Sequence, residues 1–149
     1  MDDFTMDHES KQYIVTKLDE EQYGIDIYYI DNIVRMQKIT RVPKTQSYFM
    51  GVINLRGEII PVINIRLVFG LERIDINNNT RIIIIKLEGN EKVGILVDEV
   101  KEVVMLDSES IENATKEQQS MHLEGIGKHQ NTLISILNIN SLIAEIDNS

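Results

Sequence analysis

Two apolar runs separated by a short polar turn constrain the fold of this chain more than any other feature. Val52–Leu55 and Ile59–Ile65 are built mainly from isoleucine and valine, and Arg56–Glu58 lies between them. Because β-branched residues favour strands and glycine favours turns, the segment predicts a strand pair whose turn presents an arginine. Both faces of Ile59–Ile65 are apolar, which is typical of a strand buried between two layers. Pro61 predicts an edge strand or a bulge.

The rest of the chain predicts short strands and few helices, so the expected fold class is all-β. Strands are expected at Gln12–Leu18, Gln22–Ile25, Arg81–Leu87, Lys92–Val97, Val100–Leu106, His122–Gly127 and Thr132–Ile136. Apolar residues of Ile27–Val34 recur with helical spacing, which predicts a short amphipathic helix capped by Asp26. Other expected elements are a terminal helix at Asn138–Ile146, helical turns at Ser47–Phe49 and Ile65–Phe69, and polar loops at Ile74–Thr80 and Ser108–Ser120.

Charge and cysteine content exclude several classes of function. The 149-residue chain has a net charge of -9, from 15 basic and 24 acidic residues, so we expect neither nucleic-acid binding nor membrane binding. The absence of cysteine excludes disulfides and thiolate metal sites, and it suits a reducing cytoplasm. The acidic N-terminus does not resemble a signal peptide, and no apolar run approaches the ~18 residues that span a bilayer. We therefore expect a soluble protein.

No arrangement of residues predicts a catalytic, metal or cofactor site. His8, His122 and His129 lack the spacing of metal ligands, and we expect them to be solvated. Asp98 and Glu99 are neighbours after a strand, so they point apart and are expected at a turn or a solvated edge. The sequence therefore predicts no enzyme activity, no cofactor, no metal and no small-molecule substrate.

Arg56 and two glycines are better suited to recognition than to catalysis. Arginine has five donors in a fixed fork and is enriched at interface hot spots, although an ordinary solvated turn arginine explains the position equally well. Gly51 and Gly57 are expected where the backbone needs a positive φ or a close approach, or only where it turns.

Five segments carry a resemblance to one family. They are Gly51–Arg66 (GVINLRGEIIPVINIR), Tyr23–Ile27 followed by Ile30 and Ile33, Ile39–Pro43, Val93–Val100 and Leu133–Ile139. In this order they resemble the CheW family of bacterial chemotaxis adaptors, over residues 13 to 143. The resemblance implies two small five-stranded β-barrels packed on a shared hydrophobic core. We expect one such domain at residues 11–146, between tails at 1–10 and 147–149.

The resemblance also implies partners and site residues. CheW-like adaptors couple the cytoplasmic tips of transmembrane chemoreceptors to the regulatory domain of the histidine kinase CheA, and so support signalling to the flagellar motor from cytoplasmic receptor arrays. The residues implied in receptor or kinase contact are Ile30, Ile33, Arg41, Val42, Pro43, Gly51, Arg56, Gly57, Val100 and Val103. Within this set, Ile30 and Ile33 are expected to face Val100 and Val103 across a groove for a receptor hairpin, although core packing explains Ile30 equally well. Arg41–Pro43 is expected at an edge that pairs with the kinase.

Two departures from the family pattern, and two alternatives, remain open. Asn32 and Asn64 stand where the family often has glutamate and aspartate, so partner preference is expected to differ. The same module acting as a regulatory part of a larger signalling protein, such as a coupling domain fused to a receiver or a kinase regulatory domain, is one alternative. A small β-barrel enzyme or ligand-binding domain is the other.

Overall fold

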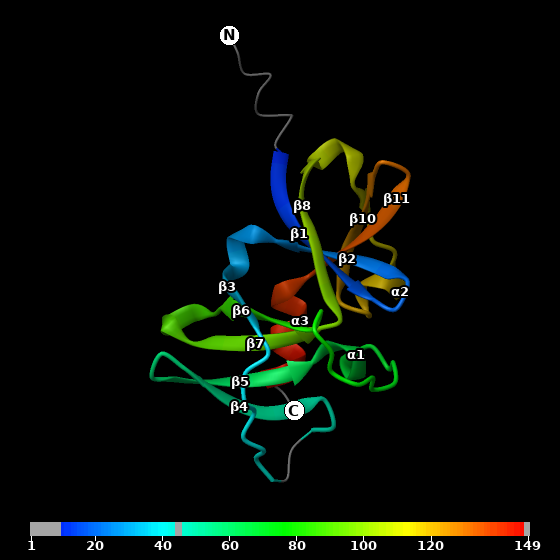
Figure 1. Cartoon of the computed structure of the whole chain (residues 1–149). Coiled ribbons are helices and arrows are strands. Elements are labelled where there is room, and N and C mark those ends of the chain that lie inside the picture. Colours follow the sequence, from blue (N-terminus) through cyan, green and yellow to red (C-terminus); the bar gives the residue numbers. More distant parts are fainter. Residues whose placement is uncertain (1–9, 44–45, 148–149) are drawn as a thin grey trace. The chain divides into compact units, whose positions relative to one another are not determined.

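The protein is built mainly from β-strands, which form two sheets in two compact units (Figure 1). The computed structural model describes residues 10–43 and 46–147. The described residues of Met1–Tyr28 and Lys101–Ser149 form the first unit, and the second unit is Tyr29–Val100. The first unit therefore contains the beginning and the end of the described chain, and the second is one continuous segment.

The sheet of the first unit has the strand order β8-β1-β2-β11-β10-β9. Its strands are β1 (Ser10–Leu18), β2 (Glu21–Asp26), β8 (Glu99–Asp107), β9 (Glu112–Asn113), β10 (Leu123–His129) and β11 (Thr132–Leu137). The short helix η4 (Ser108–Ser110) connects the two edge strands, β8 and β9, directly. One core cluster is formed by side chains of β1, β8 and β11 and consists of Tyr13, Val15, Val104, Leu106, Ile134 and Ile136. Helices α2 (Lys116–Gln119) and α3 (Ile139–Asp147) complete the unit.

The sheet of the second unit has the strand order β3-β6-β7-β5-β4. Its strands are β3 (Ile30–Arg35), β4 (Phe49–Leu55), β5 (Glu58–Asn64), β6 (Arg81–Lys86) and β7 (Lys92–Val97). The chain that leaves edge strand β3 reaches the other edge strand, β4, where Thr40 bridges Val52. The same stretch of chain therefore lies along both edges of this sheet. The core cluster here consists of Ile53, Ile60, Val62, Ile82, Ile84 and Leu96.

Most predicted elements are confirmed, including the strand pair β4–β5, the terminal helix and the helical turn α1 (Ile65–Val68). The expected mainly β fold is confirmed, with six strands in one sheet and five in the other. Ser47 and Tyr48 form one hydrogen-bonded turn, in which the Phe49 N–H donates to the Gln46 carbonyl at 3.1 Å, and the chain continues as β4 rather than as a helix. Residues 1–9 and 148–149 of the expected tails lie outside the described residues, and β1 begins at Ser10.

The prediction of an amphipathic helix at Ile27–Val34 was wrong. The segment forms a single turn of 3₁₀-helix, η2 (Ile27–Tyr29), and then strand β3, which pairs with β6. Asp26 does accept a hydrogen bond from the Tyr28 N–H at 2.9 Å, as expected for a cap. The register shifts between Ile30 and Asn32, so an extra residue interrupts the two-residue alternation of the strand. Because of this irregularity, apolar residues of a β-strand recur three positions apart, as they do in a helix.

Pro61 lies in an interior strand, which contradicts the expected edge or bulge. It pairs in register with Val52, whose N–H and C=O both bond to Thr40 on the outer side of β4, at 2.9 and 2.8 Å. The pair Val52–Pro61 therefore exchanges no hydrogen bonds, and the Pro61 nitrogen points away from β4. The pairing of β5 with β7 begins one residue later, at Val62. The proline thus removes no ladder hydrogen bond.

Candidate functional site

The turn between β4 and β5 presents the arginine that the sequence singled out. Leu55 and Glu58 form the last strand pair, so Arg56 and Gly57 are the two central residues of the hairpin loop. Both have positive φ, 54° and 86°, which is the pattern of a type I′ turn. The Gly57 N–H donates to the Asn54 side-chain oxygen at 3.1 Å, which fixes the turn from within.

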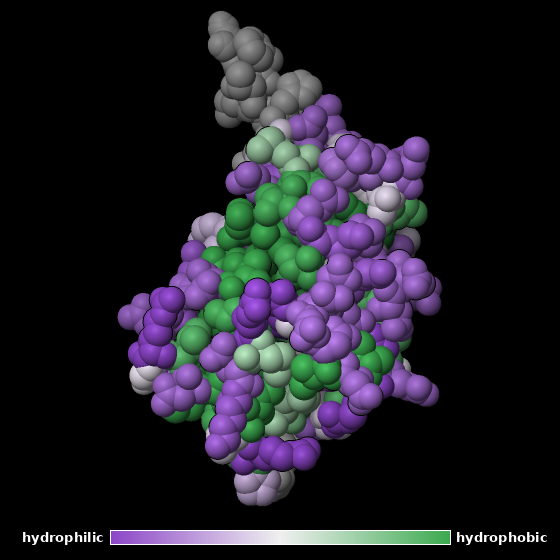
Figure 2. Space-filling model, viewed as in Figure 1, coloured by the Kyte–Doolittle hydropathy of each residue, from purple (hydrophilic) through white to green (hydrophobic). Residues whose placement is uncertain are grey.

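Arg56 is exposed, and an exposed apolar residue follows three positions later in the chain. Among the residues that the structure describes, no ion pair involves the Arg56 guanidinium. Ile59, one residue beyond the turn, is 62% exposed, whereas its neighbour Ile60 is buried in the core. The sequence had placed both faces of this strand in the interior, which is wrong for Ile59. The hairpin therefore exposes both a cation and an apolar side chain. On the face of the molecule drawn in Figure 2, hydrophobic and hydrophilic residues are mixed.

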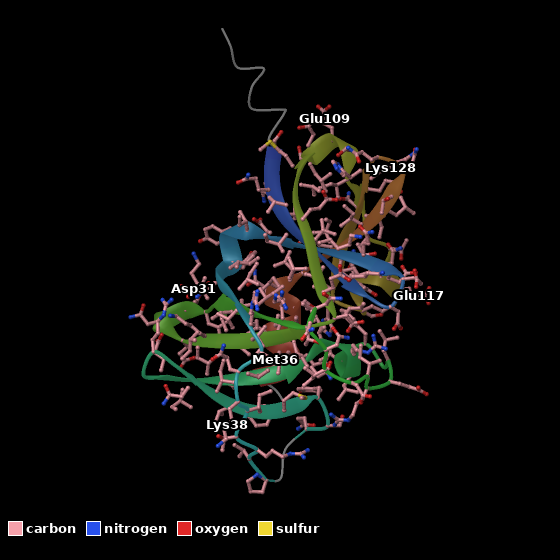
Figure 3. All side chains as sticks on the ribbon, in the orientation of Figure 1. Asp31, Met36, Lys38, Glu109, Glu117 and Lys128 are labelled. Atoms are coloured by element: carbon pink, nitrogen blue, oxygen red, sulfur yellow. The ribbon has the colours of Figure 1, made fainter. Side chains whose placement is uncertain are left out.

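A lysine on β7 that the sequence analysis missed lies near carboxylates on β5 and β3. The Lys92 ammonium, at the start of β7, lies 2.9 Å from Glu58 Oε1 and 3.5 Å from Asp31 Oδ2. Asp31 projects from β3 and is labelled in Figure 3. The hydrogen bond to Glu58 raises the pKa of Lys92, more than partial burial lowers it. No local pattern could reveal this group, because its members are far apart in the chain.

Position 51 requires glycine for both of the expected reasons, a positive φ and a close approach of the backbone. Its φ is +136°, and a Cβ at this position would lie 2.2 Å from the Thr40 carbonyl oxygen. Only glycine allows Thr40 to bridge β4 this closely. The next residues, Arg41, Val42 and Pro43, are exposed beside the β4 edge.

The predicted groove residues lie on two strands. Ile30 and Ile33 are half-buried on β3, and their register partners on β6 are Ile85 and Ile83. On β8, Val100 is half-buried and Val103 is 50% exposed. Val100 belongs to the second unit and Val103 to the first, so the groove stays a prediction.

Asp98 lies at a bend between β7 and β8, which agrees with the expected turn, but its side chain is largely shielded, which corrects the alternative of a solvated edge. Arg66 Nη1 donates to its carboxylate at 2.7 Å, and Arg66 Nε donates to the Glu72 carbonyl at 2.6 Å. The Asn64 side chain accepts from the Arg66 N–H and caps α1, so the missing family aspartate is replaced here by an amide. A cavity beside these groups has a volume of about 10 Å³, room for about one water molecule. The ion pair is therefore structural, and the cavity is too small for a substrate.

His122 is also buried rather than solvated. It is 9% exposed, and its two ring nitrogens lie 2.7 Å from Ser141 Oγ and 2.5 Å from Glu145 Oε1. Ser141 and Glu145 are four residues apart on α3, so one face of the helix holds the ring. In the described ranges 10–43 and 46–147, no group of three metal-ligating side chains could hold a metal ion.

Comparison with known proteins gives a consistent result. The family model described as "CheW-like domain" matches residues 12–147. The chain is 36% identical over 136 residues to a chemotaxis protein CheW of Bacillus subtilis, covering 89% of this chain and 86% of that protein. It is 32% identical over 134 residues to a chemotaxis protein CheW of Helicobacter pylori, covering 89% and 81%.

A solved structure has the same fold. The crystal structure of the scaffolding protein TtCheW from Thermoanaerobacter tengcongensis superimposes with a TM-score of 0.78 at 37% sequence identity. The match covers 87% of this chain and 89% of that one.

Proposed function

Because the chain belongs to the CheW family of chemotaxis proteins, we propose that it is a non-catalytic adaptor in bacterial chemotaxis. It binds the regulatory domain of the histidine kinase CheA and the cytoplasmic tip of a transmembrane chemoreceptor at the same time. By holding both, it fixes the geometry of the kinase and transmits the conformational bias of the receptor.

The observation that carries this proposal is the exposed Arg56 on a well-defined turn. The positive φ at Arg56 and Gly57, together with the Asn54 hydrogen bond, defines the backbone of the turn that carries the guanidinium. An exposed arginine in the same hairpin as an exposed isoleucine has the composition of an interface hot spot. The charged side chains of Arg66 and Asp98 already form an ion pair with each other. Because they are not available to react with a substrate, this favours recognition over catalysis.

The proposed place of action is the cytoplasm, at membrane-bound receptor arrays. Of the helices in the described part of the chain, none has the length and apolar character needed to cross a bilayer. The net charge of -9 disfavours direct binding to an anionic membrane surface. Association with the membrane is therefore proposed to occur through the receptor.

The test is a titration of the Arg56→Ala variant with each partner fragment in turn. We expect an unchanged circular dichroism spectrum and, for one of the two partners, a Kd raised by about 30-fold, which corresponds to the ~2 kcal/mol of a hot-spot residue. Arg35→Ala, which removes another exposed arginine of the same unit, is the control. Unchanged affinity for both partners would overturn the role of Arg56. Failure of the unaltered protein to bind either fragment would overturn the proposed function.

A further inference from the structure

Glu58, in the turn between β4 and β5, can compete with a partner's carboxylate for the Arg56 guanidinium. Arg56 and Glu58 are separated only by Gly57, and two residues span at most about 7 Å, within reach of two long side chains. An arginine and a glutamate this close attract each other, and a carboxylate accepts the guanidinium in a bidentate pair. A Glu58 side chain turned toward Arg56 would occupy the donors that a partner's carboxylate needs.

In the structure, Glu58 turns instead toward Lys92. Its carboxylate lies 2.9 Å from the Lys92 ammonium, although the Glu58 side chain is 52% exposed. Lys92 also has a second carboxylate partner, because Asp31 on β3 lies 3.5 Å from its ammonium. Lys92 thus has carboxylate partners on two other strands and draws Glu58 away from the arginine.

We propose that Lys92 is a positioning residue for partner binding: by engaging Glu58, it leaves the Arg56 guanidinium available to a carboxylate of the partner. The exposed Ile59 lies beside the same turn, so the surface fits an acidic side chain accompanied by an apolar one. This inference rests on the proposed function, because it presupposes that Arg56 contacts a partner. It adds Lys92, on another strand, and a competition between Glu58 and the partner for Arg56.

Loss of Lys92 therefore acts on binding through Glu58. Without the ammonium, Glu58 and Asp31 lose their shared cation, and Arg56 becomes the nearest positive group in the turn. The partner then has to displace an intramolecular ion pair. Because exposed ion pairs are weak, we expect a two- to fivefold loss of affinity.

The first test uses the free protein and needs no partner. The Arg56 Nε–H resonance is compared by NMR at one fixed pH in the unaltered protein, in Lys92→Met and in the double variant Lys92→Met/Glu58→Gln. In Lys92→Met we expect this resonance to move away from its position in the unaltered protein, because Glu58 pairs with Arg56. In the double variant we expect it to return toward that position, because no carboxylate remains at position 58. An Arg56 resonance that behaves identically in all three proteins would overturn the competition.

The second test is a double-mutant cycle with the fragment whose binding Arg56→Ala weakens. We expect Lys92→Met to weaken binding two- to fivefold, Lys92→Arg to preserve it, and the added Glu58→Gln to restore it. Lys128→Met, an exposed lysine on β10 labelled in Figure 3, is the control and should bind normally. Normal binding by Lys92→Met, or a double variant as weak as the single one, would contradict the proposal. If the unaltered protein fails to bind, the proposed function fails, while the NMR test still decides whether Lys92 controls Arg56.

Discussion

Arg66 and Asp98 form an ion pair of 2.7 Å in which both side chains are largely shielded, at 5% and 17% exposure. Arg66 lies in α1, directly after β5, and Asp98 follows β7, so the pair joins the ends of two parallel neighbouring strands. The second Arg66 bond, to the Glu72 carbonyl, ties the start of the following loop to the same point. One guanidinium thus organises this end of the sheet.

Asp98→Ala should destabilise the protein strongly. It leaves the buried Arg66 without its carboxylate, and breaking one side of a buried ion pair costs about 3–5 kcal/mol. Because Asp98 retains some exposure, we expect a loss near the lower end, about 3 kcal/mol, in urea unfolding followed by circular dichroism. The control Glu91→Ala removes an exposed carboxylate of the same unit and should change stability by less than about 0.5 kcal/mol. Equal stability of the two variants would show that the pair is not structural.

Gly51→Ala should disrupt the bridge between Thr40 and β4. The new methyl group would meet the Thr40 carbonyl oxygen at 2.2 Å, and alanine is strained at a φ of +136°. We expect a loss of at least about 2 kcal/mol, and faster hydrogen exchange at the Thr40 and Val52 amides. Exchange rates that stay unchanged at these two amides would contradict this account of Gly51.

Gly57→Ala should have a smaller and different effect. Its φ of +86° is unfavourable for alanine, but no atom lies within 4 Å of the added Cβ. We expect only the backbone strain, about 1 kcal/mol, measured by the same unfolding experiment. Gly57→Asn should lose less, since asparagine tolerates positive φ better. A larger loss in Gly57→Ala than in Gly51→Ala would reverse the expected order.

Glu124 gives the protein a predicted pH dependence. Partial burial raises the pKa of this β10 carboxyl; the nearby Lys11 ammonium lowers it, and Asp26 raises it further, so that the net shift is upward. The folded state therefore keeps this proton to a higher pH than the unfolded state, and the contribution of Glu124 to stability falls as pH rises from about 4.3 through the folded pKa. At neutral pH its ionised form is destabilising.

Glu124→Gln should consequently be more stable than the unaltered protein at pH 7, with the difference vanishing below about pH 4. Urea unfolding at both pH values measures this, and Glu117→Gln, at an exposed position on α2, is the control. A difference that persists at acid pH would show that the effect does not come from ionisation.

Local patterns predicted much of the fold and failed where distant segments meet. The hairpin β4–β5 was found because strand propensity and a glycine turn are adjacent in sequence. The bulge in β3 is created by pairing with β6, so the sequence of β3 alone imitated a helix. His122 was expected in solvent because its partners lie 19 and 23 residues away.

The Ser108–Ser120 loop contains more structure than its polarity suggested. It includes β9 and the short helix α2, whose cap, Thr115, bonds to Gln118 in both directions. A threonine followed three residues later by glutamine is the signature of a capping box, so this helix start was visible in the sequence. For the proposed recognition site, the turn and Arg56 were predictable, whereas Lys92, Glu58 and Asp31 became neighbours only through the pairing of strands that are far apart in the chain.

Simultaneous binding is the property that defines an adaptor, and a three-component mixing experiment tests it most directly. The protein is combined with the CheA regulatory domain and a receptor cytoplasmic fragment, and the mass of the complexes is measured by light scattering after size-exclusion chromatography. We predict one complex that contains all three components. If each fragment bound alone but displaced the other, the two partners would share one surface, and the adaptor function would be contradicted.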